Sequence, residues 1–280
     1  MAVEKTRIAV GSYAGKITLF DGDSSTRRSF SAGERPSYLL WKKRGLLYSV
    51  DELNLPMHQR QGAINTWRVD EKGEGTLLST FSTNGEDPCF LALSSEGRFL
   101  ITTNYSSGSL AVAELKDDIP YAMNSFVTFK GRGPRIDRQE MSHPHSVLFS
   151  QDTTILMVVD LGLDRIHRFE WTAAGLGREL SPFLLPPGSG PRMARYLNPE
   201  VLVVACELDN TIVYLNPRTG ALLRSVPTLS SDAISYCGHI EIAKDTVIVS
   251  NRGKNSLALI REGSKTNCSC GGDMNPESWT

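Results

Sequence analysis

The stretch that begins at Pro144 reads PHSVLFSQDTTILMVVDLGLDRIHRFEW and ends at Trp171. Its three apolar runs, HSVLF, TILMVVD and RIHRFEW, are separated by a polar turn and by a loop that contains Asp and Gly. Short runs of branched and aromatic residues with this punctuation are typical of β-strands that are joined by tight turns. The stretch therefore predicts three successive strands of one small sheet.

The same pattern recurs along the chain. The copies open at Pro36, Pro88, Pro144, Pro191 and Gly238, and the steps between them are 47 to 56 residues. A weaker fourth strand leads from each copy to the next. A four-stranded unit at this spacing is typical of a propeller blade, so we expect an all-β protein with a β-propeller fold.

The repeats account for about five and three-quarter blades. Residues 6–33 supply only the later strands of a blade, and the pattern stops after Arg261. We therefore expect an incomplete, C-terminally truncated propeller domain over residues 1–262. Residues 263–280 contain no Val, Ile, Leu or Phe and are expected to form a disordered, unrelated tail. Open sheet edges follow from an unclosed ring, and they predict self-association.

Composition excludes several classes of partner. The 30 basic and 31 acidic residues give a net charge of -1, whereas nucleic acid and membrane surfaces attract proteins with a basic excess. We therefore expect neither partner. The N-terminal sequence MAVEKTRIAV has no long apolar core, and the five cysteines are scattered. Both features favour a cytoplasmic protein without a disulfide framework.

Function is expected in the loop GRGPRIDRQEMSHPHSV, residues 131–147, because loops held by strands commonly carry binding and catalytic groups. Three arginines lie in this loop: Arg132, Arg135 and Arg138. His143 and His145 follow, and within a strand residues two apart face the same side. Both histidines are therefore candidate site residues, although a lone His at a strand entry is more often a structural hydrogen-bonding group.

Six motifs occur in order at blade spacing. They are NYSSGS (104–109), GRGP…RQ…HPHSV (131–147), DLGLDRI (160–166), GSGPR (188–192), the Glu207 of CELDN, and SNRG (250–253). Together they resemble the seven-bladed propeller lactonase family. That family includes the bacterial-type 6-phosphogluconolactonases and the fungal 3-carboxy-cis,cis-muconate lactonizing enzymes. The match extends from about Ile8 to Arg261.

The resemblance implies a site at one end of a central channel, lined by one His, two Arg and one Glu. The corresponding residues are His145, Arg192, Glu207 and Arg252. His143 matches a second His that is common in the family motif. Asn104 is a further substrate-binding candidate, with turn formation as its alternative role. The resemblance implies no cofactor and no metal, and the spacing of the two histidines is by itself a weak zinc signal.

Departures from the family pattern favour a propeller that has lost catalysis and serves as a binding scaffold. Met193 stands where the family usually has His, and Cys237–Ile240 stands where the family reads AAEI. The C-terminal blade that closes the ring is also missing from the pattern. Retention of the four principal positions favours an enzyme.

Two arginines at one site suit an anionic small-molecule substrate, because each guanidinium grips a carboxylate or phosphate with two hydrogen bonds. Hydrolysis of a sugar-acid lactone, above all 6-phosphogluconolactone, needs a base and a stabilised oxyanion. His145 and Glu207 are the alternative bases. Cycloisomerisation of a carboxymuconate is the other enzymatic hypothesis, with the same His as proton donor. Neighbouring Arg residues would keep Glu207 ionised, whereas burial would raise its pKa, and the sequence leaves this balance open.

Overall fold

The computed structural model describes residues 7–22, 27–43, 45–52, 61–229 and 234–261. Contacts divide the chain into two compact units, residues 1–129 and residues 130–280. Every regular element within the described ranges is a β-strand. None of these ranges forms a helix of the length and apolar character needed to cross a membrane. The structure thus confirms the all-β class.

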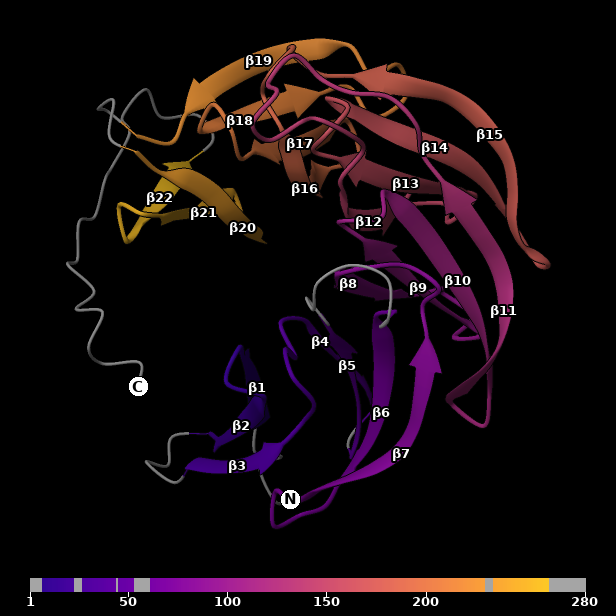
Figure 1. The fold of residues 1–280 in the computed structure, drawn as a ribbon. Coiled ribbons are helices and arrows are strands. Elements are labelled where there is room, and N and C mark those ends of the chain that lie inside the picture. Colours follow the sequence, from indigo (N-terminus) through magenta and orange to yellow (C-terminus); the bar gives the residue numbers. More distant parts are fainter. Residues whose placement is uncertain (1–6, 23–26, 44, 53–60, 230–233, 262–280) are drawn as a thin grey trace. The chain divides into compact units, whose positions relative to one another are not determined.

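Three antiparallel sheets form the first unit, coloured indigo to magenta in Figure 1. One sheet has three strands: β1 (Arg7–Ser12), β2 (Lys16–Asp21) and β3 (Arg27–Ser31). The next has four: β4 (Leu39–Lys43), β5 (Leu46–Asp51), β6 (Ala63–Val69) and β7 (Gly75–Ser82). The last also has four: β8 (Pro88–Leu93), β9 (Phe99–Asn104), β10 (Ser109–Lys116) and β11 (Ile119–Thr128).

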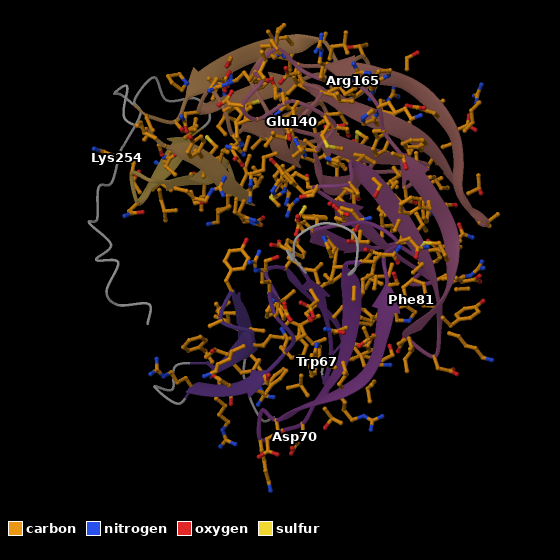
Figure 2. All side chains as sticks on the ribbon, viewed as in Figure 1. Trp67, Asp70, Phe81, Glu140, Arg165 and Lys254 are labelled. Carbon is orange, nitrogen blue, oxygen red and sulfur yellow. The ribbon has the colours of Figure 1, made fainter. Side chains whose placement is uncertain are left out.

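Apolar layers between the sheets form the core of the first unit. Leu47 and Trp67 pack with residues of the β1–β3 sheet, whereas Tyr48 and Leu100 belong to a cluster shared with the β8–β11 sheet. Both faces of β5 are therefore covered, which explains why all six of its residues are buried, the polar Ser49 and Asp51 included. The Trp67 indole, labelled in Figure 2, donates a 3.0 Å hydrogen bond to the Ser49 hydroxyl within this core.

Three antiparallel sheets also form the second unit. The first contains β12 (Pro144–Phe149), β13 (Ile155–Asp160), β14 (Arg165–Thr172) and β15 (Gly175–Leu184). The second contains β16 (Pro191–Asn198), β17 (Val201–Cys206), β18 (Thr211–Leu215) and β19 (Leu222–Pro227). The third has three strands, β20 (Tyr236–Ala243), β21 (Thr246–Arg252) and β22 (Ser256–Arg261).

The four-stranded sheets of the second unit pack face to face through a shared apolar cluster. Met157, Val159 and Ile166 from one sheet meet Leu202 and Val204 from the other, and all five are buried. This layer fixes how β12 lies against β16, whose N-terminal ends carry candidate site residues.

The repeat boundaries are confirmed where a proline opens a sheet. Pro88, Pro144 and Pro191 are the first residues of β8, β12 and β16, where a missing N–H is tolerated. Pro36 precedes its strand, which begins at Leu39.

The predicted blade count needs a small correction. Six sheets are described, and the β1–β3 and β20–β22 sheets have three strands each, so the last repeat has no fourth strand within the described ranges. The predicted tail lies outside the described residues. Self-association stays a prediction.

Candidate functional site

A register shift follows the opening proline in the first strand of both four-stranded sheets of the second unit. Pro144 pairs with Asp160 and the next paired residue is Ser146, so His145 is left between them. In the neighbouring sheet, Arg192 is left out in the same way, between Pro191 and the next paired residue. A residue in such a bulge is re-aimed relative to the pleat. The repeat therefore gives His145 and Arg192 equivalent positions.

Glu207 is the centre of the charged cluster that these residues join. It follows β17 directly and is 2% exposed. Its Oε1 atom accepts a 2.7 Å hydrogen bond from Arg138. Its Oε2 atom accepts a 2.5 Å hydrogen bond from Arg192 and lies 2.6 Å from a guanidinium nitrogen of Arg252. Both carboxylate oxygens are thus engaged by arginines, which come from a loop, from β16 and from β21.

The turn that carries Glu207 is held against the GSGP loop by main-chain hydrogen bonds. The Glu207 N–H donates to the Gly190 carbonyl at 2.7 Å, and the Leu208 N–H donates to the Ser189 carbonyl at 3.0 Å. Gly190 has φ +62°, and a Cβ atom there would lie 2.4 Å from Leu208 Cγ. Glycine is therefore needed at this position to let the Glu207 turn approach.

The arginines decide the ionisation of Glu207. Burial raises its pKa. The charges of Arg192 and Arg252 and the hydrogen bond from Arg138 lower the pKa by more than burial raises it, and the result is a pKa of about 2. The balance that the sequence left open is thus settled in favour of the carboxylate, which stays ionised at neutral pH.

His145 lies within the field of this cluster and is 8% exposed. Burial lowers its pKa well below 6.5, and the charges of Arg192 and Arg252 lower it further, whereas Glu207 opposes them. At neutral pH the imidazole is therefore uncharged and able to accept a proton.

The cluster carries a surplus of positive charge. Three guanidinium groups and one carboxylate, beside a neutral imidazole, leave two positive charges. Burial lowers the pKa of Arg252, and the nearby Arg192 lowers it further, which is the mark of like charges held close together. A bound anion would relieve this repulsion, so the arrangement suits an anionic ligand.

His143 has a different environment from His145, because β12 begins only at Pro144. Its Nε2 atom lies 3.1 Å from Oε1 of Glu140, a residue of the same loop that is labelled in Figure 2. Its main-chain N–H donates to Asp160 Oδ1 at 2.9 Å. The structure thus gives His143 loop-holding contacts and does not repeat the environment of His145.

Asp160 anchors the loop that leads to His145. Besides the His143 N–H, its fully buried carboxylate accepts hydrogen bonds from the Ser142 hydroxyl at 2.6 Å and from His167 Nε2 at 3.0 Å. Asp160 also accepts from the main-chain N–H groups of its own turn. A buried carboxylate with this many donors is a structural hub for the loop.

Asn104 belongs to the first unit, whereas the cluster is built from the second. Its side chain is buried and donates a 3.0 Å hydrogen bond to the Ser109 hydroxyl across the β9–β10 turn. A Cβ atom on Gly85 would lie 2.3 Å from Asn104 Nδ2, so the amide also packs against the loop between β7 and β8. These contacts match a turn-forming role.

The departures from the family pattern fall on different kinds of position. Met193 is 4% exposed and part of the core. Cys237 is buried, and Thr228 lies within hydrogen-bond reach of its sulfur. The register shift of β20 falls between Cys237 and Ile240, so Gly238 and His239 are both left out of the ladder there. About half of the His239 side chain is exposed.

Arg138 is the cluster residue that sequence reasoning missed. The loop 131–147 contains three arginines, and nothing in their spacing distinguishes one from another. The structure does, because Arg138 reaches Glu207, Arg135 donates a 2.7 Å hydrogen bond to the Leu208 carbonyl, and Arg132 is exposed.

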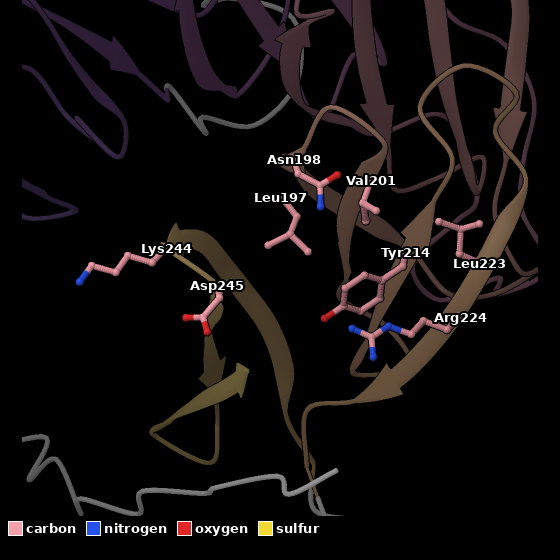
Figure 3. A pocket seen from close by; sticks show the side chains of 8 residues that line it. All are labelled: Leu197, Asn198, Val201, Tyr214, Leu223, Arg224, Lys244 and Asp245. Atoms are coloured by element: carbon pink, nitrogen blue, oxygen red, sulfur yellow. The ribbon is translucent and has the colours of Figure 1, made fainter. Parts of the chain in front are cut away.

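A separate cavity of about 410 Å³ lies where β16 ends and β17 begins, at the ends of these strands that are far from Arg192 and Glu207. Figure 3 shows it from close by. Its lining residues are Leu197, Asn198, Val201, Tyr214, Leu223, Arg224, Lys244 and Asp245. None of the predicted site residues lines it. Within the described ranges, no group of three or more His, Cys, Asp or Glu side chains is arranged to hold a metal ion.

Residues 8–267 match the model of the family described as lactonase, 7-bladed β-propeller. A 6-phosphogluconolactonase of Bacillus subtilis is 28% identical over 237 residues, and one of Formosa agariphila is 32% identical over 200 residues. A solved Bacteroides fragilis structure, described provisionally as a 6-phosphogluconolactonase, superposes with a TM-score of 0.79 at 27% identity and covers 95% of this chain and 81% of its own.

The chain is shorter than these curated relatives. The B. subtilis alignment covers 80% of this chain but 66% of the relative, and the F. agariphila alignment covers 65% of this chain and 56% of the relative.

Proposed function

Because the chain belongs to the seven-bladed β-propeller lactonase family, we propose that it hydrolyses a sugar-acid lactone, with 6-phosphogluconolactone as the preferred substrate. The observation that carries the proposal is the cluster around Glu207, which places a neutral imidazole beside two surplus positive charges. Both properties suit an anionic lactone, and the relatives named above are 6-phosphogluconolactonases by name.

His145 is the better base of the two alternatives. The carboxylate of Glu207 has a pKa of about 2, and arginines engage both of its oxygens, so it is a poor proton acceptor at neutral pH. The imidazole of His145 is neutral there. We assign proton transfer to His145 and the orientation of the arginines to Glu207.

In the proposed reaction, His145 takes a proton from water as the water oxygen bonds to the lactone carbonyl carbon. The carbonyl oxygen becomes an oxyanion, which a guanidinium of the cluster stabilises. Collapse of this intermediate breaks the bond to the ring oxygen, and the imidazolium returns its proton to that oxygen. Arg192 and Arg252 bind the charged group of the substrate. The relatives' names favour hydrolysis over cycloisomerisation of a carboxymuconate.

We propose the cytoplasm as the compartment, without nucleic acid or membrane partners. The buried cysteines Cys206 and Cys237 are free thiols, as expected in a reducing compartment. The balanced charge of the chain supports the absence of a polyanionic partner.

The test is acid release from 6-phosphogluconolactone at neutral pH, corrected for spontaneous hydrolysis. Wild-type protein is compared with His145→Gln and with Arg252→Gln. We expect catalysis by the wild type and a loss of ~10²-fold or more in His145→Gln. A folded wild-type protein with only the spontaneous rate would overturn the proposal and favour the non-catalytic scaffold.

A further inference from the structure

Arg138 makes two contacts that join its loop to other parts of the second unit. It donates to Glu207 Oε1 at 2.7 Å, and its guanidinium lies over the ring of Tyr236, 5.5 Å from the ring centroid. The side chain is 31% exposed, whereas the carboxylate that it binds is 2% exposed. The ion pair is thus partly shielded from water, where such pairs are stronger than on an open surface.

Hydrogen bonds of the neighbouring residue fix the loop backbone at Arg138. The next residue, Gln139, is fully buried, and its amide donates 2.8 Å hydrogen bonds to the Leu161 carbonyl and to Asp164 Oδ1. The Gly133 N–H donates to the Gln139 carbonyl at 2.9 Å. Because its neighbour is locked in the fold, the backbone of Arg138 has little freedom, and its side chain is aimed at Glu207.

Tyr236 connects Arg138 to the opposite side of the cluster. In the β20–β21 ladder, Tyr236 is the direct partner of Arg252. Arg138 therefore touches the carboxylate that Arg252 binds and also covers the ring of the residue paired with Arg252. One side chain ties together the loop, the Glu207 turn and β20.

We propose that Arg138 and Tyr236 form a positioning pair for the anion-binding arginines, an inference that rests on the proposed function for its substrate. Arg138 occupies Oε1 of Glu207, so that Oε2 is turned toward Arg192 and Arg252. The pair acts through Glu207 and sets where the anionic group of the substrate is bound.

The proposal predicts a loss that depends on substrate charge. Arg138→Gln should raise KM for 6-phosphogluconolactone ~10-fold or more with a smaller change in kcat, since positioning of an anion site affects binding first. For glucono-1,5-lactone, which lacks the phosphate, KM should change little. Arg138→Lys keeps the charge without the planar fork and should recover only part of the loss.

Matched variants separate positioning from general effects. Arg132→Gln removes the same charge from an exposed position of the same loop and should match the wild type. Tyr236→Phe keeps the ring face and should also match it, whereas Tyr236→Leu should raise KM for the phosphorylated lactone. Because the tyrosine variants leave the Arg138–Glu207 ion pair in place, they test the proposal even if Arg138→Gln does not fold.

Calorimetric binding of 6-phosphogluconate distinguishes this inference from the proposed function. Weaker binding in Arg138→Gln than in Arg132→Gln supports the positioning pair, even if no lactone is hydrolysed. The inference would be overturned if these two variants bound 6-phosphogluconate with equal affinity and if Arg138→Gln changed KM, relative to the wild type, by the same factor for both lactones. This holds even if the wild type is an active lactonase. The inference would also be overturned if Arg138→Gln lowered the melting temperature but left KM for 6-phosphogluconolactone at the wild-type value, since that is the effect of a purely structural residue.

Discussion

His145 and Arg192 occupy the same position in two adjacent sheets, and the Ser146 hydroxyl links them by a 2.9 Å hydrogen bond to the Arg192 carbonyl. In each sheet, the residue after the opening proline is left unpaired by the ladder. A repeated backbone irregularity therefore places a histidine in one sheet and an arginine at the equivalent position of the next.

The pH dependence of catalysis should report the environment of His145. The neutral imidazole is the active form of a base, and burial holds its pKa well below 6.5. The neutral form therefore persists as the pH falls through 6.5. We expect wild-type kcat/KM to stay level through this pH and to decline only at more acid values.

Relieving the positive field should move this decline. In Arg252→Gln one of the charges that lower the pKa of His145 is gone, so the acid limb of the kcat/KM profile should shift to higher pH. The profile is measured with glucono-1,5-lactone, which does not depend on the arginines for binding a phosphate. An acid limb that stays in place would contradict the assignment of His145 as the base.

The repeating parts of this molecule were predictable, and the long-range parts were not. Strands such as Ile155–Asp160 follow from their own apolar pattern, and the prolines mark the sheet openings. The environment of His143 depends on where β12 begins, and the prediction of a shared face with His145 assumed a strand that includes both residues. Because Arg138 meets Glu207 across 69 residues of chain, no local pattern distinguishes it from Arg132.

Glu207 should stabilise the fold at neutral pH and lose this effect in acid. Its pKa is about 2 in the folded protein against a reference value of 4.5, so folding favours the ionised form. The contribution is complete above pH 4.5 and is lost as the pH falls toward 2. The shift corresponds to about 3 kcal/mol of unfolding free energy.

Urea unfolding of Glu207→Gln tests this expectation. The variant should be about 3 kcal/mol less stable than the wild type at neutral pH, with a difference that narrows as the pH is lowered below 4.5. Glu200→Gln is the control, because Glu200 forms an exposed 3.0 Å ion pair with Arg218 and its loss should cost under about 0.5 kcal/mol. A difference between Glu207→Gln and wild type that is independent of pH would contradict the ionic origin of the effect.

Cys206 and Cys237, the cysteines in the described part of the second unit, should be unreactive while the protein is folded. Burial raises the pKa of the Cys206 thiol well above 9, and burial also raises that of Cys237 to about 11. Since the thiolate is the nucleophile, iodoacetamide at neutral pH should leave both unmodified in the native protein and label both in denaturing urea. Peptide mass spectrometry reads each site separately, and the partly exposed Cys89 is the internal reference. If Cys206 were labelled in the native protein as fast as Cys89, the apolar layer that buries Cys206 between the two four-stranded sheets would have to open in the folded state.

Gly190→Ala should damage the site more than Gly188→Ala. Both glycines have positive φ, +62° and +80°, so alanine strains the backbone by about 1 kcal/mol at either position. At Gly188 the new methyl group would meet its nearest neighbour at 3.6 Å, an ordinary contact. At Gly190 it would lie 2.4 Å from Leu208 Cγ and would push away the turn that carries Glu207.

We therefore expect Gly190→Ala to lose about 2–4 kcal/mol of stability, against about 1 kcal/mol for Gly188→Ala. Binding of 6-phosphogluconate should also weaken in Gly190→Ala, because displacement of Glu207 disorganises Arg192 and Arg252, the arginines that share its Oε2 atom. Urea unfolding and calorimetry measure the two effects on the same samples. Equal stability and equal affinity in the two variants would mean that the approach of Leu208 to the GSGP loop does not hold the site together.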